Sequence, residues 1–305
     1  MLGFNMNLID DFCQANGLGP SFYDTADDYY LPLLDYLVQK KTPNTLILGI
    51  NGTQGAGKST LAEFLASAAA TLHGWRVTCL SLDDIYLSKS ARESLSREVH
   101  PLLRTRGVPG THDLDLGVET LSRLCELQDG ETLQVPRFDK AADDQLPKSE
   151  WYLAEGKQDL VIFEGWCVGC RAQPVEELDE PVNELESKED PDKLWRRHVN
   201  KCHFEYEERL WSKIEILAML KVSSFEDVYH MRSEQERRLV ESLGRQTELS
   251  DPVKLRRFIS HYQRITNYML ADLPARADIL MKLNRDRRVF SMRPDLTANT
   301  ANQIN

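Results

Sequence analysis

Short apolar runs alternate with longer stretches of helical periodicity along most of the chain. The runs that predict strands lie at 45–50, 75–84, 132–140, 159–166, 214–223 and 278–283. The stretches that predict helices lie at 58–74, 116–127, about 192–212, 224–243 and from 252 onward. Strands that alternate with helices predict an α/β fold with a mostly parallel sheet covered by helices on both faces.

Local sequence signals set some of the expected boundaries. Gly74 ends the first long helix, residues 223–226 (SSFE) read as a capping box, and Asp251–Pro252 opens the last helix. Residues 1–43 predict two short helices before Pro43. We therefore expect an N-terminal helical extension over 1–43 and one larger domain over 44–305.

The loop after the strand at 45–50 carries the clearest chemical signal. Residues 52–59, GTQGAGKS, fit G-x-x-x-x-G-K-[ST] at every fixed position, and a helix follows at once. Glycines let backbone N–H groups turn toward phosphate oxygens, and the helix N-terminus adds partial positive charge. This pattern predicts an ATP-binding P-loop (Walker A) formed by Gly52, Thr53, Gln54, Gly55, Ala56, Gly57, Lys58, Ser59 and Thr60. Lys58 is expected at the β- and γ-phosphates and Ser59 on Mg²⁺.

Composition narrows the class of protein. The 305 residues carry a formal net charge of -11, which disfavours a nucleic-acid partner. The first residues do not resemble a targeting signal, and no apolar run is long enough for a membrane span. Six scattered cysteines are typical of a reducing compartment, so a cytoplasmic location is expected. The oligomeric state is left open.

Acidic residues follow two of the predicted strands. Asp83 and Asp84 follow the run at 75–82, and Glu164 ends the run at 160–163. Ligands of open α/β sheets gather at the carboxyl ends of strands. Asp83 is therefore a candidate general base, and Glu164 a candidate metal-supporting acid; turn formation is the alternative for each. Asp84 is left open.

Two polar loops supply candidates for the acceptor side. We expect Arg106, in a loop shaped by Gly107 and Pro109–Gly110, to act in catalysis by binding an acceptor anion. The other predicted substrate contacts are Tyr86, His112, Asp113 and Arg137. The alternative for each loop arginine is that its side chain simply faces solvent. The same two interpretations, substrate contact or exposure to solvent, apply to Asp139 and Lys140.

Two further segments stand out, one by its acidic composition and one by the spacing of two cysteines. Residues 172–190 hold eight acidic residues and one lysine, which is typical of a solvated surface insertion. Cys167 and Cys170 form C-x-x-C, but no second pair of metal-ligand spacing accompanies them. Packing is therefore favoured for both cysteines over a metal or redox role.

The motifs GINGTQGAGKST, SLDDIYL, RGVPGTHD, PRFDK and FEGWCVG, in this order, resemble the plant- and fungal-type D-glycerate 3-kinases. These are P-loop kinases related to phosphoribulokinase, uridine kinase and bacterial pantothenate kinase. The resemblance covers about residues 45–290. It implies ATP- and Mg²⁺-dependent phosphorylation of D-glycerate to 3-phosphoglycerate. It also implies a helical lid that includes Arg232 and Arg237.

One segment departs from the family pattern. Plant members continue after PRFDK into Gly-Arg-Gly-Asp-Arg, whereas this chain has AADDQLPKSEW at 141–151. A kinase for a pantothenate- or nucleoside-like acceptor is therefore kept as an alternative, and so is a regulatory ATP-binding protein without transfer activity. A GTPase is disfavoured because the chain has no N-K-x-D motif.

Overall fold

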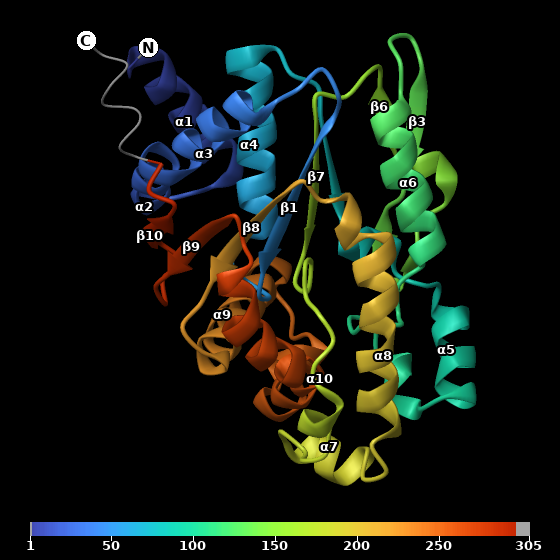
Figure 1. Cartoon of the computed structure of the whole chain (residues 1–305). Helices are drawn as coiled ribbons and strands as arrows, with labels where there is room; N and C mark the ends of the chain where they lie inside the picture. The colour runs from blue at the N-terminus through green and yellow to red at the C-terminus, as the bar shows by residue number, and fades with distance from the viewer. Residues whose placement is uncertain (1, 297–305) are drawn as a thin grey trace.

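A computed structural model describes residues 2–296 of the chain around a central sheet (Figure 1). The sheet has six strands in the order β10-β9-β8-β1-β7-β2. They are β1 (Leu46–Gly52), β2 (Val77–Ser81), β7 (Leu160–Gly165), β8 (Ile216–Lys221), β9 (Ile279–Leu283) and β10 (Val289–Arg293). Neighbouring strands pair in parallel except β10, which is antiparallel to β9. The predicted α/β class with a mostly parallel sheet is confirmed.

Helices cover both faces of this sheet. They are α1 (Leu2–Asn16), α2 (Pro20–Thr25), α3 (Leu31–Lys40), α4 (Lys58–His73), α5 (Lys89–Glu98), α6 (Leu114–Glu126), α7 (Glu184–Glu189), α8 (Leu194–Arg209), α9 (Phe225–Leu243) and α10 (Pro252–Asp272). The first four share a hydrophobic core with one sheet face, whereas α6, α8 and α10 share a second core with the other face. Strand side chains alternate between the two cores: Ile162 lies in the first and Phe163 in the second.

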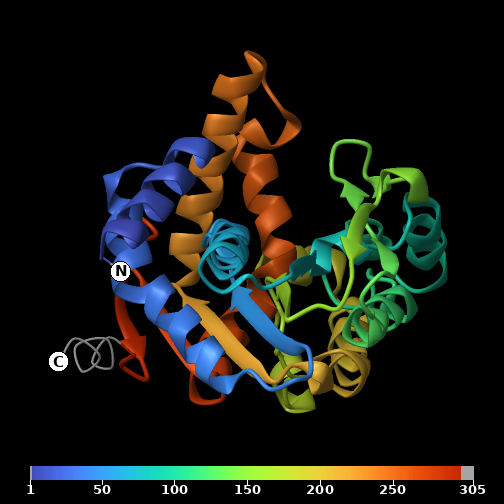
Figure 2. The ribbon, with the colours of Figure 1, turned by 90° about the horizontal axis from the view of Figure 1, so that it is seen from above.

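The N-terminal helices pack directly on the helix that follows the P-loop. Phe64 of α4 is fully buried, and its ring contacts those of Phe12, Phe22 and Tyr30 at centroid distances of 5.3, 5.7 and 5.9 Å. Figure 2 shows these helices on the opposite side of the molecule from the segment around residues 130–155. The buried aromatic cluster joins helices α1 to α3 to the central core.

Some boundaries differ from the sequence prediction. The strand expected over 75–84 ends at Ser81, because the Ser81 hydroxyl accepts a hydrogen bond from the Asp83 N–H and turns the chain into a 3₁₀ helix, Leu82–Ile85. The capping box of α9 lies one residue later than expected and joins Ser224 to Asp227.

The strand expected over 132–140 lies outside the central sheet. It is divided into β3 (Thr132–Val135) and β4 (Phe138–Asp139). Strand β3 pairs with β6 (Tyr152–Glu155), and β4 pairs with β5 (Asp144–Gln145). The short hairpin β4–β5 lies beside the site described below.

The acidic segment 172–190 is less solvated than its charge suggests. Glu186 and Asp190 are each only 1% exposed, and each pairs with a buried arginine. Arg264 of α10 donates to both Glu186 carboxylate oxygens, at 2.7 and 2.6 Å, and Arg196 of α8 lies 2.9 Å from Asp190. The expectation of a fully solvated run is wrong for these two residues, because buried charges on neighbouring helices hold them inside.

Within residues 2–296, the helices do not include one that is both long and apolar enough to cross a lipid bilayer.

Candidate active site

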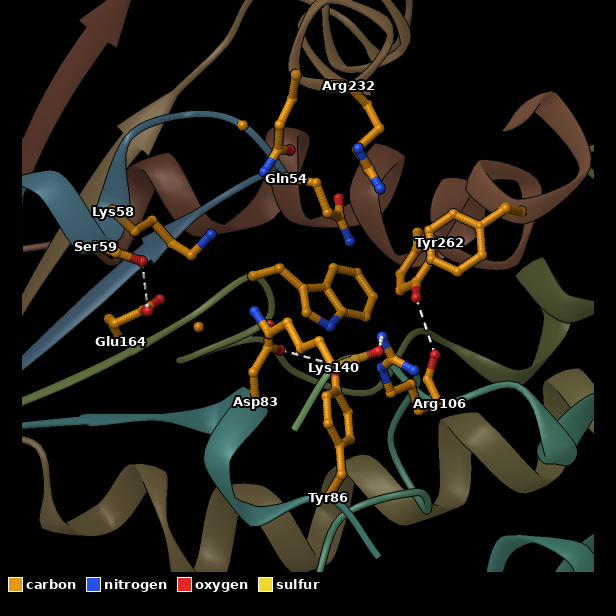
Figure 3. Close-up of a pocket in the computed structure, with 15 residues that line it drawn as sticks. Gln54, Lys58, Ser59, Asp83, Tyr86, Arg106, Lys140, Glu164, Arg232 and Tyr262 are labelled. Atoms are coloured by element: carbon orange, nitrogen blue, oxygen red, sulfur yellow. Dashed lines mark hydrogen bonds and ion pairs between the residues drawn. The ribbon is translucent and has the colours of Figure 1, made fainter. Parts of the chain in front are cut away.

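Three loops meet at the carboxyl edge of the sheet because of its strand order. Strand β7 lies between β1 and β2, and its residue Glu164 is in register with Ile50 of β1 and Ser81 of β2. The P-loop, the turn that carries Asp83, and Glu164 are therefore neighbours (Figure 3). This is the edge where open α/β sheets bind their ligands.

The P-loop backbone is shaped by glycines. Gly55 and Gly57 have φ values of +79° and +91°, which side-chain-bearing residues rarely adopt. A Cβ atom on Gly52 would lie 3.0 Å from Leu220 Cβ, and one on Gly55 would lie 3.2 Å from Met231 Cβ. The loop therefore keeps a concave backbone cradle that larger residues would distort. Gln54, Gly55, Lys58 and Ser59 line the cavity.

Several P-loop polar groups lack a protein partner in the structure. Thr53 Oγ1 and Gln54 Oε1 are buried without a hydrogen-bond partner among the described residues. Lys58 Nζ donates only a long hydrogen bond, 3.3 Å, to the Thr53 carbonyl. Such groups are available to a ligand, and the cradle, the lysine and the helix N-terminus together fit a nucleotide polyphosphate. Five residues of the predicted P-loop set are not among those that line the cavity: Gly52, Thr53, Ala56, Gly57 and Thr60.

Ser59 and Glu164 provide hard oxygen atoms next to the P-loop. The Ser59 hydroxyl donates to Glu164 Oε1 at 2.9 Å. Across the described residues, no group of three or more His, Cys, Asp or Glu side chains could hold a metal alone. Mg²⁺ usually binds one or two protein oxygens and takes its other ligands from water and phosphate, so this pair fits such an ion.

Asp83 faces the cavity and is held by two donors. Tyr86 Oη donates to Asp83 Oδ1 at 2.7 Å, and Lys140 Nζ donates to Oδ2 at 2.7 Å. Burial alone would raise the pKa of Asp83, but the Lys140 ammonium and the two hydrogen bonds outweigh it and lower the pKa. Asp83 is therefore ionised at neutral pH, and each of its oxygens keeps a second lone pair for a substrate proton.

Arg106 lines the cavity from a loop fixed by aromatic side chains. Tyr262 Oη donates to the Arg106 carbonyl at 2.9 Å, and Trp166 Nε1 donates to the Gly107 carbonyl at 2.8 Å. Gly107 has φ +132°, and a Cβ atom there would lie 2.3 Å from Tyr262 Oη. The backbone before Val108 is therefore held tightly against α10.

The cavity enclosed by these loops is small and positively charged. Its volume is about 230 Å³. Four of its lining residues are cations and two are carboxylates: Lys58, Arg106, Lys140, Arg232, Asp83 and Glu164. This local excess of positive charge contrasts with the formal net charge of -11 for the chain, and it fits anionic ligands.

Three residues predicted to contact substrate lie outside the cavity lining. His112 is buried behind Tyr86, with the two rings stacked at 4.6 Å and His112 Nδ1 2.7 Å from Tyr206 Oη. Burial lowers the pKa of His112 to about 3, so it is neutral. Asp113 caps α6 by accepting from the Leu116 N–H. Arg137 pairs with Asp84 at 2.6 Å.

The structure also adds residues that the sequence did not single out. Trp166, Gln235, Phe258 and Tyr262 line the cavity. Gln235 lies on α9 and Phe258 and Tyr262 lie on α10, so their positions depend on the packing of these two helices against the P-loop edge, for which no local motif exists. Trp166 alone had a signal, since it follows Glu164 at the end of an apolar run.

Two remaining expectations concern the lid and the cysteine pair. Arg232 of α9 lines the cavity, whereas Arg237 is exposed and pairs with Glu241 at 2.6 Å.

Cys167 and Cys170 are free thiols in the core, and burial raises the pKa of each. Raised pKa values disfavour the thiolate that metal binding or redox chemistry needs, which supports a packing role.

Comparisons with known proteins agree with this geometry. A segment of 139 residues is 37% identical to the chloroplastic D-glycerate 3-kinase of Arabidopsis thaliana; it covers 43% of this chain and 30% of that protein. The uncharacterized kinase mug58 of Schizosaccharomyces pombe is 30% identical over 245 residues, which is 75% of this chain and 83% of mug58. The chain belongs to the family of D-glycerate 3-kinase-like P-loop kinases.

A solved structure supports the same assignment for this kinase. The D-glycerate 3-kinase of Cryptococcus neoformans superposes with a TM-score of 0.71 and 26% identity, over 90% of this chain and 99% of that one. No protein-family model matches the chain. The kinase relatives named above indicate that this kinase is an ATP-dependent phosphotransferase that acts on a hydroxyl acceptor.

Proposed function

We propose that this kinase transfers the γ-phosphate of ATP to the 3-hydroxyl of D-glycerate, giving 3-phosphoglycerate and ADP. The observation that carries the proposal is a single cavity of about 230 Å³ that holds the P-loop, Asp83 and Arg106 together. The relatives named above support the acceptor, since two of them are D-glycerate 3-kinases. The cytoplasmic location and the absence of a nucleic-acid partner stay predictions from the sequence.

Different residues of the cavity would bind the nucleotide and the acceptor. Lys58 and the P-loop amides would bind the β- and γ-phosphates, and Ser59 with Glu164 would hold Mg²⁺, which spreads the negative charge of the phosphates when bound. Asp83 would orient the acceptor hydroxyl and take its proton. Arg106 would bind the acceptor carboxylate as a planar donor fork.

Lys140 would act both on Asp83 and on the acceptor hydroxyl. The exposed Lys140 side chain places its ammonium on Asp83 in the structure, and the carboxylate raises the pKa of Lys140. It therefore stays charged and keeps Asp83 ionised. A charged lysine next to the acceptor hydroxyl would also stabilise negative charge that develops during transfer.

The decisive experiment is an acceptor panel with coupled detection of ADP. D-glycerate, glycerol, pantothenate and uridine are offered at equal concentrations with MgATP. We expect turnover with D-glycerate and little with glycerol, which has the same hydroxyls but no carboxylate. Turnover of pantothenate or uridine alone would replace the acceptor, and ATP binding without any turnover would favour a regulatory ATP-binding protein.

Arg106→Lys tests the acceptor side. A lysine keeps the positive charge but loses the second parallel donor, so we expect the KM for D-glycerate to rise about tenfold or more. The KM for ATP should change little, because Arg106 is not part of the P-loop. Steady-state kinetics with each substrate varied in turn measures both values. An unchanged KM for D-glycerate would show that the acceptor carboxylate binds elsewhere.

A further inference from the structure

The hairpin β4–β5 places an acidic residue directly behind Arg106. Its turn is built by Asp139, whose Oδ1 accepts from the Ala141 and Ala142 N–H groups at 2.8 and 3.1 Å. Asp143 follows with φ +59°, a left-handed conformation that aspartate tolerates better than most residues. This turn directs the Asp143 carboxylate toward two arginines.

Both arginines bind the same oxygen of Asp143. Arg92 Nη2 lies 2.8 Å from Asp143 Oδ1, and Arg106 Nη1 donates to that oxygen as well. Arg92 is 1% exposed and is fixed by further hydrogen bonds to the carbonyls of Leu87, Arg104 and Asp143. The buried guanidinium therefore anchors the carboxylate, and the carboxylate holds Arg106.

The hairpin fixes Arg106 from other directions too. Arg106 Nη2 donates to the Lys140 carbonyl at 3.2 Å, and its guanidinium lies 5.5 Å from the centre of the Phe138 ring. Arg106 still lines the cavity, with its side chain 26% exposed. Its guanidinium is thus held at the rim of the cavity rather than free in solvent.

The charges of this cluster do not balance. Among the described residues, Asp143 is the carboxylate paired with Arg92 and also the one paired with Arg106. Two guanidinium groups share one carboxylate, so the cluster keeps an excess positive charge. The side of Arg106 that faces the cavity is where an additional anion can bind it.

We propose that Asp143 is the residue that positions Arg106 for the carboxylate of the acceptor. The proposal rests on the function proposed above and assigns the segment that departs from the family pattern, 141–151, a part in acceptor recognition. Asp143 touches neither the phosphates nor the reacting hydroxyl, so it acts through Arg106 as a positioning residue.

The first test is Asp143→Asn, with Asp144→Asn as a matched control. Asparagine keeps the size of the side chain and tolerates the left-handed backbone, but it lacks the charge that holds Arg106. We expect the KM for D-glycerate to rise roughly 10- to 100-fold, as for loss of a charged hydrogen bond, with kcat at saturating D-glycerate and the KM for ATP within about twofold of wild type. Asp144 accepts from the Lys89 and Gln145 N–H groups instead, so its variant should leave the KM near that of wild type.

A double-mutant cycle separates positioning from general loss of structure. In an Arg106→Gln background the guanidinium is absent, so Asp143→Asn should raise the KM for D-glycerate no further. Independent effects that multiply would mean that Asp143 does not act through Arg106, and would overturn the proposal.

A second variant is needed because Asp143→Asn leaves the buried Arg92 guanidinium without its carboxylate partner, and this loss can prevent folding. If that protein does not fold, Asp143→Glu supplies the answer: it keeps a counter-charge for Arg92 but moves the carboxylate by one methylene, and so displaces Arg106. A raised KM for D-glycerate in this variant supports the proposal, and an unchanged KM overturns it.

Failure of the proposed function has a different signature. Wild-type protein that phosphorylates no carboxylate acceptor removes both proposals together. Active wild-type protein with an unchanged KM in the Asp143 variants removes only this one.

Discussion

Asp83→Asn is expected to lower kcat by about 10²- to 10⁴-fold while ATP affinity changes little. Asparagine preserves the shape of the side chain and can still accept from Tyr86, but it cannot take the proton of the acceptor hydroxyl. It also removes the counter-charge of Lys140, which lies 2.7 Å from Asp83 Oδ2. Nucleotide binding should persist because Lys58, Ser59 and the loop amides are untouched. Steady-state kinetics with D-glycerate and calorimetry with nucleotide measure the two effects.

Asp84→Asn is the matched control for this substitution. Asp84 lies in the same 3₁₀ helix but faces away from the cavity, where it accepts from the Ser81 N–H at 3.2 Å and pairs with Arg137. We expect a smaller loss of kcat, caused only by loosening of the turn. Near-normal turnover in Asp83→Asn, or a larger loss in Asp84→Asn, would move the general base away from Asp83.

Lys58→Ala is expected to reduce kcat/KM for ATP by about 10²- to 10³-fold, as for loss of one preorganised cation from a phosphate site. The fold should be unaffected, since within residues 2–296 the Lys58 ammonium makes only one long hydrogen bond. Thermal unfolding of the variant should therefore match that of wild type, and calorimetry should show weaker nucleotide binding.

A lysine outside the cavity gives the comparison for this variant. Lys188 of α7 is exposed and pairs with Glu184 at 3.2 Å, far from the P-loop in the sequence. Lys188→Ala should leave both turnover and nucleotide binding unchanged. Full activity in Lys58→Ala would contradict the assignment of the P-loop.

The P-loop half of the site was predictable from the sequence because its signals are local. Strand, glycine-rich loop and helix follow one another within residues 45–74, and the same residues determine both their conformation and their chemistry. The positions of Asp83 and Glu164 beside the P-loop could be predicted nearly as well, since strand ends in a parallel sheet meet at one edge.

The part of the cavity around Arg106, where we propose that the acceptor binds, was harder to predict because it depends on packing. His112 and Arg137 lie in the expected loops, but their side chains turn to Tyr206 and Asp84 instead of the cavity. Tyr262 reaches the site only because α10 packs against the loop that carries Arg106. The pairing of Asp143 with Arg106 joins residues 37 positions apart, and no periodic pattern predicts it.

The aromatic contacts of Phe64 change how the chain can be divided. Phe64 lies on the same helix as Lys58 and Ser59, and the rings of Phe12, Phe22 and Tyr30 cover it. A shortened protein that began at residue 44 would expose this aromatic surface to water at the back of the nucleotide site. We therefore expect the segment before residue 44 to be needed for a stable kinase, and any fusion or truncation should keep it.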